Sequence, residues 1–468
     1  MLNSARMSEK MSISQKNEIK AKEVEFGGKI FELIKILYPI CRSITGDGVR
    51  KTLKILQKEI PLDINEIPTK TKCFDWKIPK EWNITDAYIK DPNGNKIVDF
   101  KNSNLHVVSY SIPINKKMRL KELKKHLHYL SEKPKAIPYR TSYYNEYWGF
   151  CISYNQFKRL REGEYEVCIN SSLKNGSLTY GEYLVPGKIK DEILLSCYIC
   201  HPSLCNDNLS GIGLLTILAK ILTKISTHYS YRFLFIPETI GAIAWLSKNE
   251  NNIHKIKHGL VATCCGDRGT FTYKKTRDGD NIIDEIVEKV LKKSGETYEI
   301  LDFWPSGSDE RQFSSPGFNL PIGSLMKTLY DKFEEYHTSN DNIEFMEVKS
   351  LGNSLSKYLE VIYELENHTN KNKKSIQKTL KISVKNDPVF ISQNMKCEPQ
   401  LGKKDLYQKL GALTNQNSNE IKRAIQWIMN FSDGYYSLSE ISKKSKMNLK
   451  ILTDAANLLK DVNLLKEQ

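Results

Sequence analysis

Apolar runs alternate with helical patterns from about residue 164 to residue 366. The run at 193–200 is short and lacks the alternation of a half-exposed strand, which favours a parallel strand buried on both faces. Residues 210–222 follow with apolar positions at helical spacing and predict a helix. Further strands are expected at 165–169, 178–185, 231–236, 259–265 and 321–326, and further helices at 242–248, 282–293 and 345–365. The pattern predicts an α/β fold with a mixed, mostly parallel sheet flanked by helices.

The segments on either side of this region have other patterns. Residues 26–60 are helical with an interruption at 39–48, and we assign 23–61 together with 164–370 to the α/β domain. Residues 62–163 contain short strand-like runs separated by turn signals such as Asp91-Pro92-Asn93-Gly94. These features predict a β-rich domain inserted into the α/β domain.

The tail, residues 371–468, has the layout of a winged helix-turn-helix. Strands are expected at 378–384 and 389–392, and helices at 419–431, 437–444 and 449–459. Such a domain either binds DNA or serves as a packing or dimerisation module. The helix that would read bases carries Asp454 and Asp461 and no arginine, so nucleic acid is not the partner we expect.

Composition limits the class of protein. The 468-residue chain has a formal charge of +15, but its lysines are scattered, as on a solvated surface. No apolar run has membrane length, and residues 1–22 are polar, so we expect a disordered lead-in and a cytoplasmic protein without a membrane partner. Several of the cysteines lie in apolar strands, where cysteine behaves as a small hydrophobe. The oligomeric state stays open, and a homo-oligomer is compatible with the sequence.

Potential metal ligands follow the predicted strands. His201, Asp207, Glu238 and Asp267 each come just beyond an apolar run, and His337 follows a strand at longer range. The carboxyl ends of strands in an open α/β sheet form the edge where ligands bind. Histidine with carboxylates suits zinc or a similar divalent ion, and a spare carboxylate such as Glu238 could take a proton from bound water.

A cysteine-ligated zinc site around His201 is a weaker alternative. Cys197 and Cys200 point to opposite faces of one strand, which is poor geometry for sharing one ion.

Several residues are candidates for contact with a substrate. An arginine lies among dense aromatic residues at 138–151, and this segment could form an aromatic core or a wall that faces the substrate. Its candidate residues are Arg140, Tyr143 and Trp148. Arg42, in the polar interruption of the first helix, and Asp309, in the loop at 306–310, are further candidates.

The chain also resembles the zinc aminopeptidase-like fold shared by bacterial leucyl aminopeptidases, several carboxypeptidases and glutaminyl cyclases. The matching segments are Cys200-His201 with Asn206-Asp207-Asn208-Leu209-Ser210-Gly211, Pro237-Glu238-Thr239-Ile240-Gly241, Ser308-Asp309 with Phe313 and Gly317, and Tyr336-His337-Thr338 with Asp341. More narrowly, it is similar to a bacterial subfamily often named for polysaccharide biosynthesis, with an inserted β domain and a C-terminal winged helix. The segments shared with that subfamily are Arg42-Ser43-Ile44-Thr45-Gly46, Tyr139-Arg140-Thr141-Ser142-Tyr143-Tyr144 and Trp148-Gly149-Phe150-Cys151.

The resemblance implies roles for the strand-end residues. His201, Asp207 and His337 would be metal ligands, Asp267 matches a further ligand position, and Glu238 would be the general base. The second of two successive glutamates, normally a metal ligand, is Thr239 here. Because a threonine hydroxyl is a poor zinc ligand, one zinc ion is favoured over two.

These observations predict a zinc-dependent, aminopeptidase-like hydrolase of amide bonds that acts on a small peptide or an acyl amide. Two alternatives stay open. One is a deacylase or amidohydrolase acting on an amino sugar or another small metabolite. The other is a non-enzymatic DNA-binding or regulatory protein on a degenerate peptidase fold.

Overall fold

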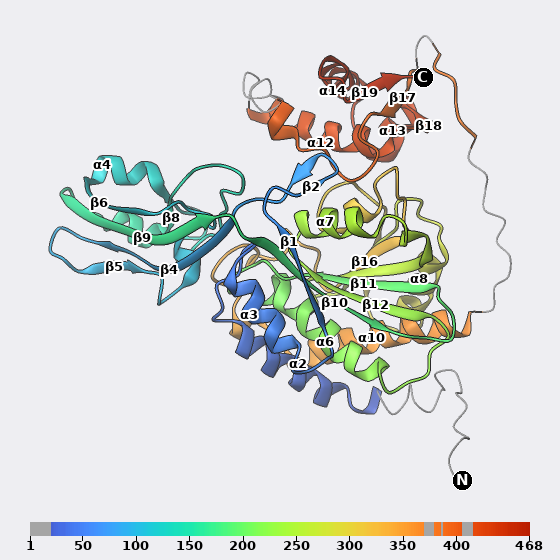
Figure 1. Cartoon of the computed structure of the whole chain (residues 1–468), viewed down its shortest axis with the longest axis horizontal. Coiled ribbons are helices and arrows are strands. Elements are labelled where there is room, and N and C mark those ends of the chain that lie inside the picture. The colour runs from blue at the N-terminus through green and yellow to red at the C-terminus, as the bar shows by residue number, and fades with distance from the viewer. Residues whose placement is uncertain (1–19, 369–378, 385–386, 405–414) are drawn as a thin grey trace.

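The computed structural model describes residues 20–368, 379–384, 387–404 and 415–468, and it contains three units (Figure 1). An α/β body forms the largest part, a β-rich insert extends to one side of it, and the C-terminal unit lies above it. The expected disordered lead-in at 1–22 falls almost entirely outside the described residues.

The body contains one mixed sheet in the order β1-β10-β12-β11-β13-β16-β14-β15. The four central strands, β12, β11, β13 and β16, are parallel, whereas β1, β10 and β14 each pair antiparallel with a neighbour. The strands are β1 (Asp63–Pro68), β10 (Ser177–Val185), β11 (Glu192–Tyr198), β12 (Ser230–Ile236), β13 (Ile256–Ala262), β14 (Phe271–Lys274), β15 (Tyr298–Leu301) and β16 (Ile322–Met326). The predicted fold class is confirmed.

Helices cover both faces of this sheet (Figure 1). One face packs against α2 (Glu23–Leu37), α3 (Asp47–Leu56), α6 (Ser210–Leu222), α8 (Ile282–Lys293) and α10 (Val348–Asn367), and α7 (Ile240–Asn249) covers the other. Along β11, Ile193 and Leu195 enter the first core while Leu194 enters the second. The central strand is therefore buried on both faces, as its continuous apolar run predicts.

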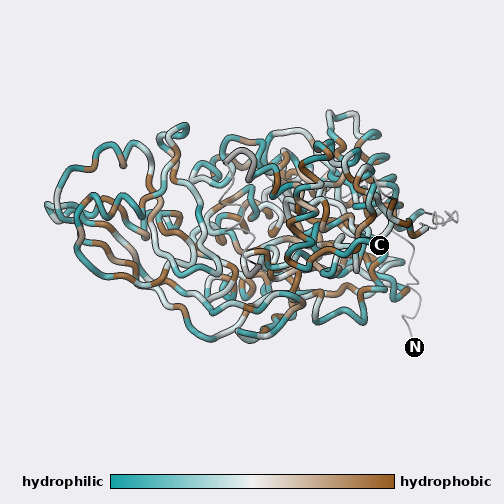
Figure 2. Tube along the Cα trace, turned by 90° about the horizontal axis from the view of Figure 1, so that it is seen from above, coloured by the Kyte–Doolittle hydropathy of each residue, from teal (hydrophilic) through white to brown (hydrophobic). Residues whose placement is uncertain are grey.

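The insert has its own four-stranded antiparallel sheet in the order β5-β4-β9-β6. Its strands are β4 (Glu81–Lys90), β5 (Lys96–Asp99), β6 (Ile114–Arg119) and β9 (Glu164–Lys174). Viewed from above, it forms the narrow end of the molecule, where hydrophobic and hydrophilic segments alternate along the trace (Figure 2). The predicted limits of 62 and 163 are wrong at both ends, because β1 pairs with β10 of the body and β9 is a central strand of the insert.

The C-terminal unit is the predicted winged helix. It contains β17 (Val389–Ser392), α12 (Asn415–Phe431), β18 (Asp433–Ser437), α13 (Leu438–Ser445), α14 (Leu449–Asp461) and β19 (Leu465–Glu467). Residue 378 of the strand expected at 378–384 lies outside the described residues, and 379–384 form no strand beyond a bridge at Val384.

A buried ion pair joins the winged helix to the body. The Arg277 guanidinium contacts the Asp433 carboxylate, and both side chains are almost fully buried. Its Nη2 also donates to the Asn430 carbonyl at 2.8 Å, while Phe303 of the body packs into the core of the winged helix. The C-terminal unit is therefore fixed against the body by polar and apolar contacts.

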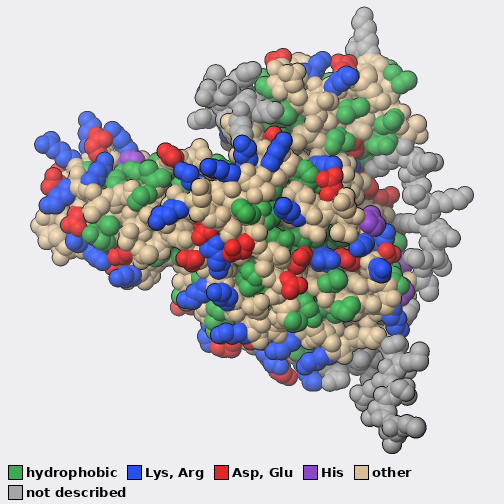
Figure 3. Space-filling view, in the orientation of Figure 1, with side chains coloured by type: hydrophobic (Ala, Val, Ile, Leu, Met, Phe, Trp, Pro, Cys, Tyr) green, Lys and Arg blue, Asp and Glu red, His purple; other side chains and the backbone are tan. Residues whose placement is uncertain are grey.

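Charged side chains of both signs are interspersed over the face seen in Figure 3, in agreement with the scattered charge of the sequence. Within the described ranges, no helix is long and apolar enough to cross a membrane.

We expect Arg277→Ala to weaken the attachment of the winged helix, because Asp433 would keep a buried charge without its cation. Loss of one partner of a buried pair typically costs about 3–5 kcal/mol. The midpoint of urea unfolding should fall accordingly, whereas Arg159→Ala, at an exposed site of the insert, should leave it almost unchanged. An unchanged midpoint in Arg277→Ala would show that the ion pair does not hold the two units together.

Candidate metal centre

The candidate site lies at the carboxyl edge of the parallel strands. His201 follows β11, and Asp207 lies in the irregular turn Cys205–Leu209 that leads into α6. Glu238 lies between β12 and α7, and His337 lies in the loop after β16. The topology therefore brings together residues that are far apart in the sequence, as the rule for open α/β sheets predicts.

His201, Asp207 and His337 form a group whose potential ligand atoms lie within 4.8 Å of one another. The His337 Nε2 atom is 2.9 Å from Asp207 Oδ2, and His201 Nδ1 is 3.4 Å from the same oxygen. Asp207 Oδ2 and His337 Nε2 are both buried, and apart from these contacts within the group neither has a hydrogen-bond partner among the described residues. Buried polar atoms are almost always satisfied. A divalent cation between them would satisfy both, and the donor set suits zinc.

The other oxygen of Asp207 is already occupied. The Tyr198 hydroxyl donates to Asp207 Oδ1 and lies 2.6 Å from the Thr263 hydroxyl. Asp341 then fixes the backbone of the turn, because its carboxylate accepts the Asn206 N–H at 2.6 Å and the Asp207 N–H at 3.0 Å. The role of Tyr198 was not predictable from the sequence, since a tyrosine inside an apolar strand looks like a core residue.

The Asp207 carboxyl stays ionised although it is buried. Burial opposes ionisation of Asp207, but the His201 and His337 rings hold the pKa of its carboxyl well below the usual range. Burial raises the pKa of Asp341 to about 8, although the N–H group of Asn206 opposes this rise. Asp207 is therefore the buried anion around which the site is arranged.

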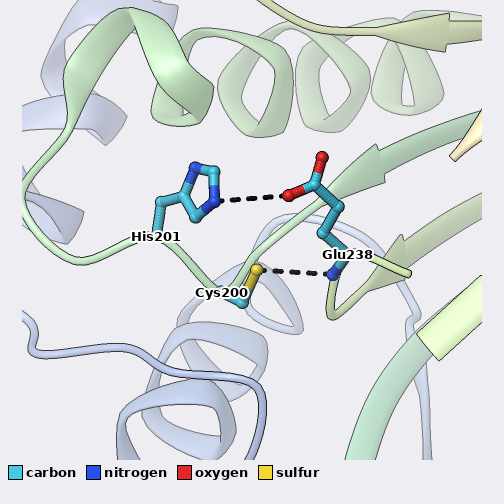
Figure 4. A group of neighbouring side chains, drawn as sticks. All are labelled: Cys200, His201 and Glu238. Carbon is cyan, nitrogen blue, oxygen red and sulfur yellow. Dashed lines mark hydrogen bonds and ion pairs between the residues drawn. The ribbon is translucent and has the colours of Figure 1, made fainter. Parts of the chain in front are cut away.

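Glu238 lies on the opposite side of His201 from Asp207. Its Oε2 is 3.4 Å from His201 Nε2, and its side chain is 26% exposed (Figure 4). A carboxylate that is open to solvent yet next to a ligand is well placed to exchange protons.

Cys200 also lies beside His201, and its sulfur accepts the Glu238 N–H at 3.3 Å (Figure 4). Burial raises the pKa of the Cys200 thiol to about 12, so the sulfur is a neutral acceptor at neutral pH. Cys200, His201 and Glu238 also form a group whose potential ligand atoms lie within 4.8 Å of one another. Cys197 lies in the first core and Cys200 in the second, so the two thiols cannot share one ion.

Thr239 stands where the resemblance implies a second glutamate, and its polar groups are bonded to Arg311 and Asp309. Its hydroxyl accepts from Arg311 Nη2 at 2.9 Å, and its N–H donates to Asp309 Oδ1 at 2.6 Å. Asp309 has no exposed surface, and burial beside Glu238 raises the pKa of its carboxyl well above the usual value. Asp309 is therefore too deeply buried to contact a substrate, and that prediction is wrong. Its carboxylate instead holds the Glu238–Thr239 turn through the Thr239 N–H.

Asp267 is not a member of the ligand group. One of its oxygens accepts from Asn206 Nδ2 at 2.8 Å, and the other accepts from the Thr328 hydroxyl at 2.5 Å. Asp267, expected as a ligand, therefore positions Asn206, the residue before Asp207.

Two of the predicted substrate contacts also lie elsewhere. Trp148 is in the core of the insert, where its ring stacks on the His126 ring with the ring centres 3.7 Å apart. Arg42 is fully buried and donates through Nε to the His201 carbonyl at 3.0 Å. Arg42 therefore supports the loop that carries His201, whereas Arg140 is exposed at the surface of the insert.

Tyr143 does reach the site, through Tyr139. The two hydroxyls are 3.1 Å apart, and the Tyr139 ring lies edge-on to both His201 and His337, with ring centres 5.2 and 5.3 Å away. The Tyr139 N–H also donates to the His337 carbonyl at 2.8 Å. The aromatic segment of the insert thus forms a wall of the metal centre.

Comparison with known proteins fits this geometry. Residues 31–368 match the domain family of unknown function DUF4910, and residues 389–467 match a winged helix-turn-helix family. The chain belongs to the DUF4910 family. A protein of Clostridium acetobutylicum is 52% identical over 442 residues, which cover 94% of this chain and 97% of that protein. It is provisionally named as a polysaccharide biosynthesis protein with an aminopeptidase-like domain.

Solved structures show the same fold for this DUF4910 member. A crystal structure from Clostridium acetobutylicum, provisionally named a peptidase, is 50% identical, has a TM-score of 0.75 and covers 98% of this chain and all of that one. A zinc aminopeptidase of Bacillus subtilis is 13% identical, with a TM-score of 0.53 over 72% of this chain and 95% of its own. A peptidase M28 precursor of Shewanella amazonensis is 12% identical and has a TM-score of 0.53. The match covers 76% of this chain and 98% of that one. The resemblance found in the sequence motifs is confirmed at the level of fold.

Asp207 is in the candidate ligand group and Asp267 is not, so the same substitution at the two positions tests the assignment of the ligands. Asp207→Asn should lower zinc affinity by more than about a hundredfold, because changes in the outer partners of a metal site alone cost 10–100-fold. Asp267→Asn should change it by less than about tenfold, since that carboxylate acts only through Asn206. Competition with a chromogenic chelator measures both, and equal losses in the two variants would refute the assignment.

Proposed function

We propose that this DUF4910 protein is a zinc-dependent hydrolase of amide bonds, with His201, Asp207 and His337 as ligands and Glu238 as general base. The observation that carries the proposal is that two histidine nitrogens converge on one buried carboxylate oxygen: Asp207 Oδ2 is 2.9 Å from His337 Nε2 and 3.4 Å from His201 Nδ1. The aminopeptidase fold of its structural neighbours supports the same class of reaction.

The residues divide the work of hydrolysis. Bound zinc would polarise a carbonyl group and lower the pKa of a water molecule to about 7. Glu238, partly exposed and beside His201, would accept the proton of the attacking water and return it to the leaving amine. Asp309 holds the Glu238–Thr239 turn in place, because its carboxylate accepts the Thr239 N–H.

A single ion is favoured by two occupied positions. The Tyr198 hydroxyl donates a hydrogen bond to Asp207 Oδ1, so this oxygen would be less available to a second ion. Thr239, which replaces a carboxylate ligand, is bonded to the Arg311 guanidinium. A second cation would therefore lie beside the Tyr198 phenol and the Arg311 guanidinium, neither of which supplies the anionic ligand that it needs.

The two non-peptidase alternatives are not equally supported. The exposed side of α14 carries Lys450 and Lys460 but also Asp454 and Asp461, so it has no excess of positive charge for DNA. An acyl amide on a sugar would use the same metal and the same base, so this alternative shares the residues of the site. None of the ten cysteines, all in the described part of the chain, forms a disulfide, which fits the cytoplasmic location that we propose.

We expect the purified protein to hold about one zinc ion per chain. Elemental analysis after gentle dialysis, normalised to protein by amino-acid analysis, measures the ratio. Two tightly held ions would contradict the single-ion site and would assign Glu238 or another nearby carboxylate as a replacement ligand.

Glu238→Gln keeps the shape of the side chain and removes the base. We expect the variant to fold and to hold zinc, while turnover of an aminoacyl or acyl amide falls by at least about a hundredfold. Zinc content and rate must be measured on the same preparation. Loss of zinc would make Glu238 a ligand, and full activity with zinc retained would assign the base elsewhere.

A further inference from the structure

We propose that the insert positions both histidine ligands, with Tyr139 as the central positioning residue, so that zinc binds tightly only while the insert is docked on the body. This inference rests on the proposed function, because it concerns the ligands of the same metal centre. It gives the β-rich insert and the loop at 42–46 a role in building that centre.

The first connection joins residues 137–139 of the insert to the loop that carries His337. The Tyr139 N–H donates to the His337 carbonyl at 2.8 Å. The Ser339 N–H donates to the Ile137 carbonyl at 2.8 Å, and the Ile137 N–H donates to Ser339 Oγ at 3.0 Å. The two segments also form an antiparallel bridge. The insert therefore holds the His337 loop through a short ladder of hydrogen bonds.

His337 needs such support because its backbone has an uncommon conformation. Its φ angle is 52°, in the left-handed region that residues with a side chain seldom adopt. A residue stays in that region only when its surroundings hold it there. Without the insert, the loop would relax toward ordinary backbone angles, and the His337 ring would no longer be held beside Asp207.

The side chain of Tyr139 fills a small apolar core between the insert and the ligand loops. This core contains Leu105 and Tyr139 of the insert and Leu204 of the body, and all three are buried. Leu204 lies in the turn between His201 and Asp207, so the core packs against the segment that carries two of the ligands. The Tyr139 ring also lies edge-on to both histidine rings and thereby limits their rotation.

The second connection reaches His201 through the loop that precedes α3. In that loop, Arg42 donates through Nε to the His201 carbonyl at 3.0 Å. The next residue, Ser43, has its hydroxyl 2.7 Å from the hydroxyl of Ser109 in the insert. The insert therefore supports one histidine through its own backbone and the other through the loop that contains Arg42.

These contacts make zinc binding and docking of the insert interdependent. If the ligand loops hold their binding-competent shape for only a fraction of the time, the apparent zinc affinity falls by that fraction. The coupling is reciprocal, so bound zinc should favour the docked insert by the factor by which docking favours zinc.

Hydrogen exchange of the full chain with and without zinc tests this coupling without any substitution. We expect exchange of the Tyr139 and Ser339 amides, which form the ladder, to be at least about tenfold slower with zinc bound. The amides of the β4–β5 pair, at the far end of the insert, should exchange at equal rates in both states (Figure 1). Equal rates at Tyr139 and Ser339 would overturn the inference.

Substitutions test the positioning role directly. Tyr139→Leu keeps an apolar side chain but removes the ring, and we expect it to lower zinc affinity at least about tenfold, because outer partners of a metal site are worth about 10–100-fold. Tyr139→Phe keeps the ring and should retain most of the affinity. Ser339→Ala removes one bond of the ladder and should lower the affinity by about two- to tenfold. Competition with a chromogenic chelator measures all three.

Matched controls separate positioning from general loss of stability. Tyr165→Leu makes the same change in the insert's own core, so it should lower the thermal midpoint and leave zinc affinity unchanged. Ser131→Ala, at the exposed surface of the insert, is the control for Ser339→Ala. Equal losses of affinity in Tyr165→Leu and Tyr139→Leu would overturn the inference. If Tyr139→Leu does not fold, Ser339→Ala and the exchange experiment decide.

The proposed function can fail separately. If zinc binds to His201, Asp207 and His337 but Tyr139→Leu binds it as tightly as the unchanged chain, the ligands are right and the positioning role is wrong. If zinc binding depends on Tyr139 and no amide of any kind is cleaved, the positioning role stands and the hydrolase is wrong. A chain that binds no zinc would overturn both.

Discussion

The Asp207 carboxylate is the constraint on which the rest of this structure depends. It has no exposed surface, and an ionised carboxylate is stable in such a place only when cations and donors surround it. Tyr198 supplies a donor to one oxygen, and the two histidines face the other. The backbone N–H of Asp207 is itself held by the buried Asp341. The loops after β11 and β16 are thereby tied to one point at the edge of the sheet.

The insert and the winged helix complete this centre from outside the sheet. Tyr139 of the insert closes the side of the two histidines, and its backbone bonds to that of His337. The C-terminal segment closes the opposite side of the cleft through Glu398 and Gln400, which bond to the hairpin that follows β1. These contacts come from residues outside the α/β sheet, so the surroundings of the centre depend on all three units.

The apolar pattern predicted the fold and the core of the site because both depend on regular geometry. A fully apolar strand implies a buried parallel strand, and residues after such strands must meet at one edge. His201, Asp207, Glu238 and His337 follow from that rule. Asp267 obeys the same rule and still lies outside the group, because the turn after β13 directs its carboxylate to Thr328. Turn direction depends on tertiary contacts that periodicity does not encode.

Residues that act through long-range packing were not predictable in the same way. Trp148 and Tyr143 lie in one aromatic segment, yet one enters the core of the insert and the other faces the cleft. Arg311 carried no signal in the sequence, since its role arises from contact with Thr239 and with a C-terminal residue, Glu398. The limits of the insert were missed because β1 and β9 pair with strands distant in sequence.

The most direct test of the account is anomalous diffraction at the zinc edge from crystals of the full chain grown with zinc. The account predicts one peak per chain, at about 2.0–2.2 Å from an Asp207 oxygen and from nitrogens of His201 and His337. A peak bound by Cys200 and Glu238, or a second peak of equal height beside Tyr198, would contradict it.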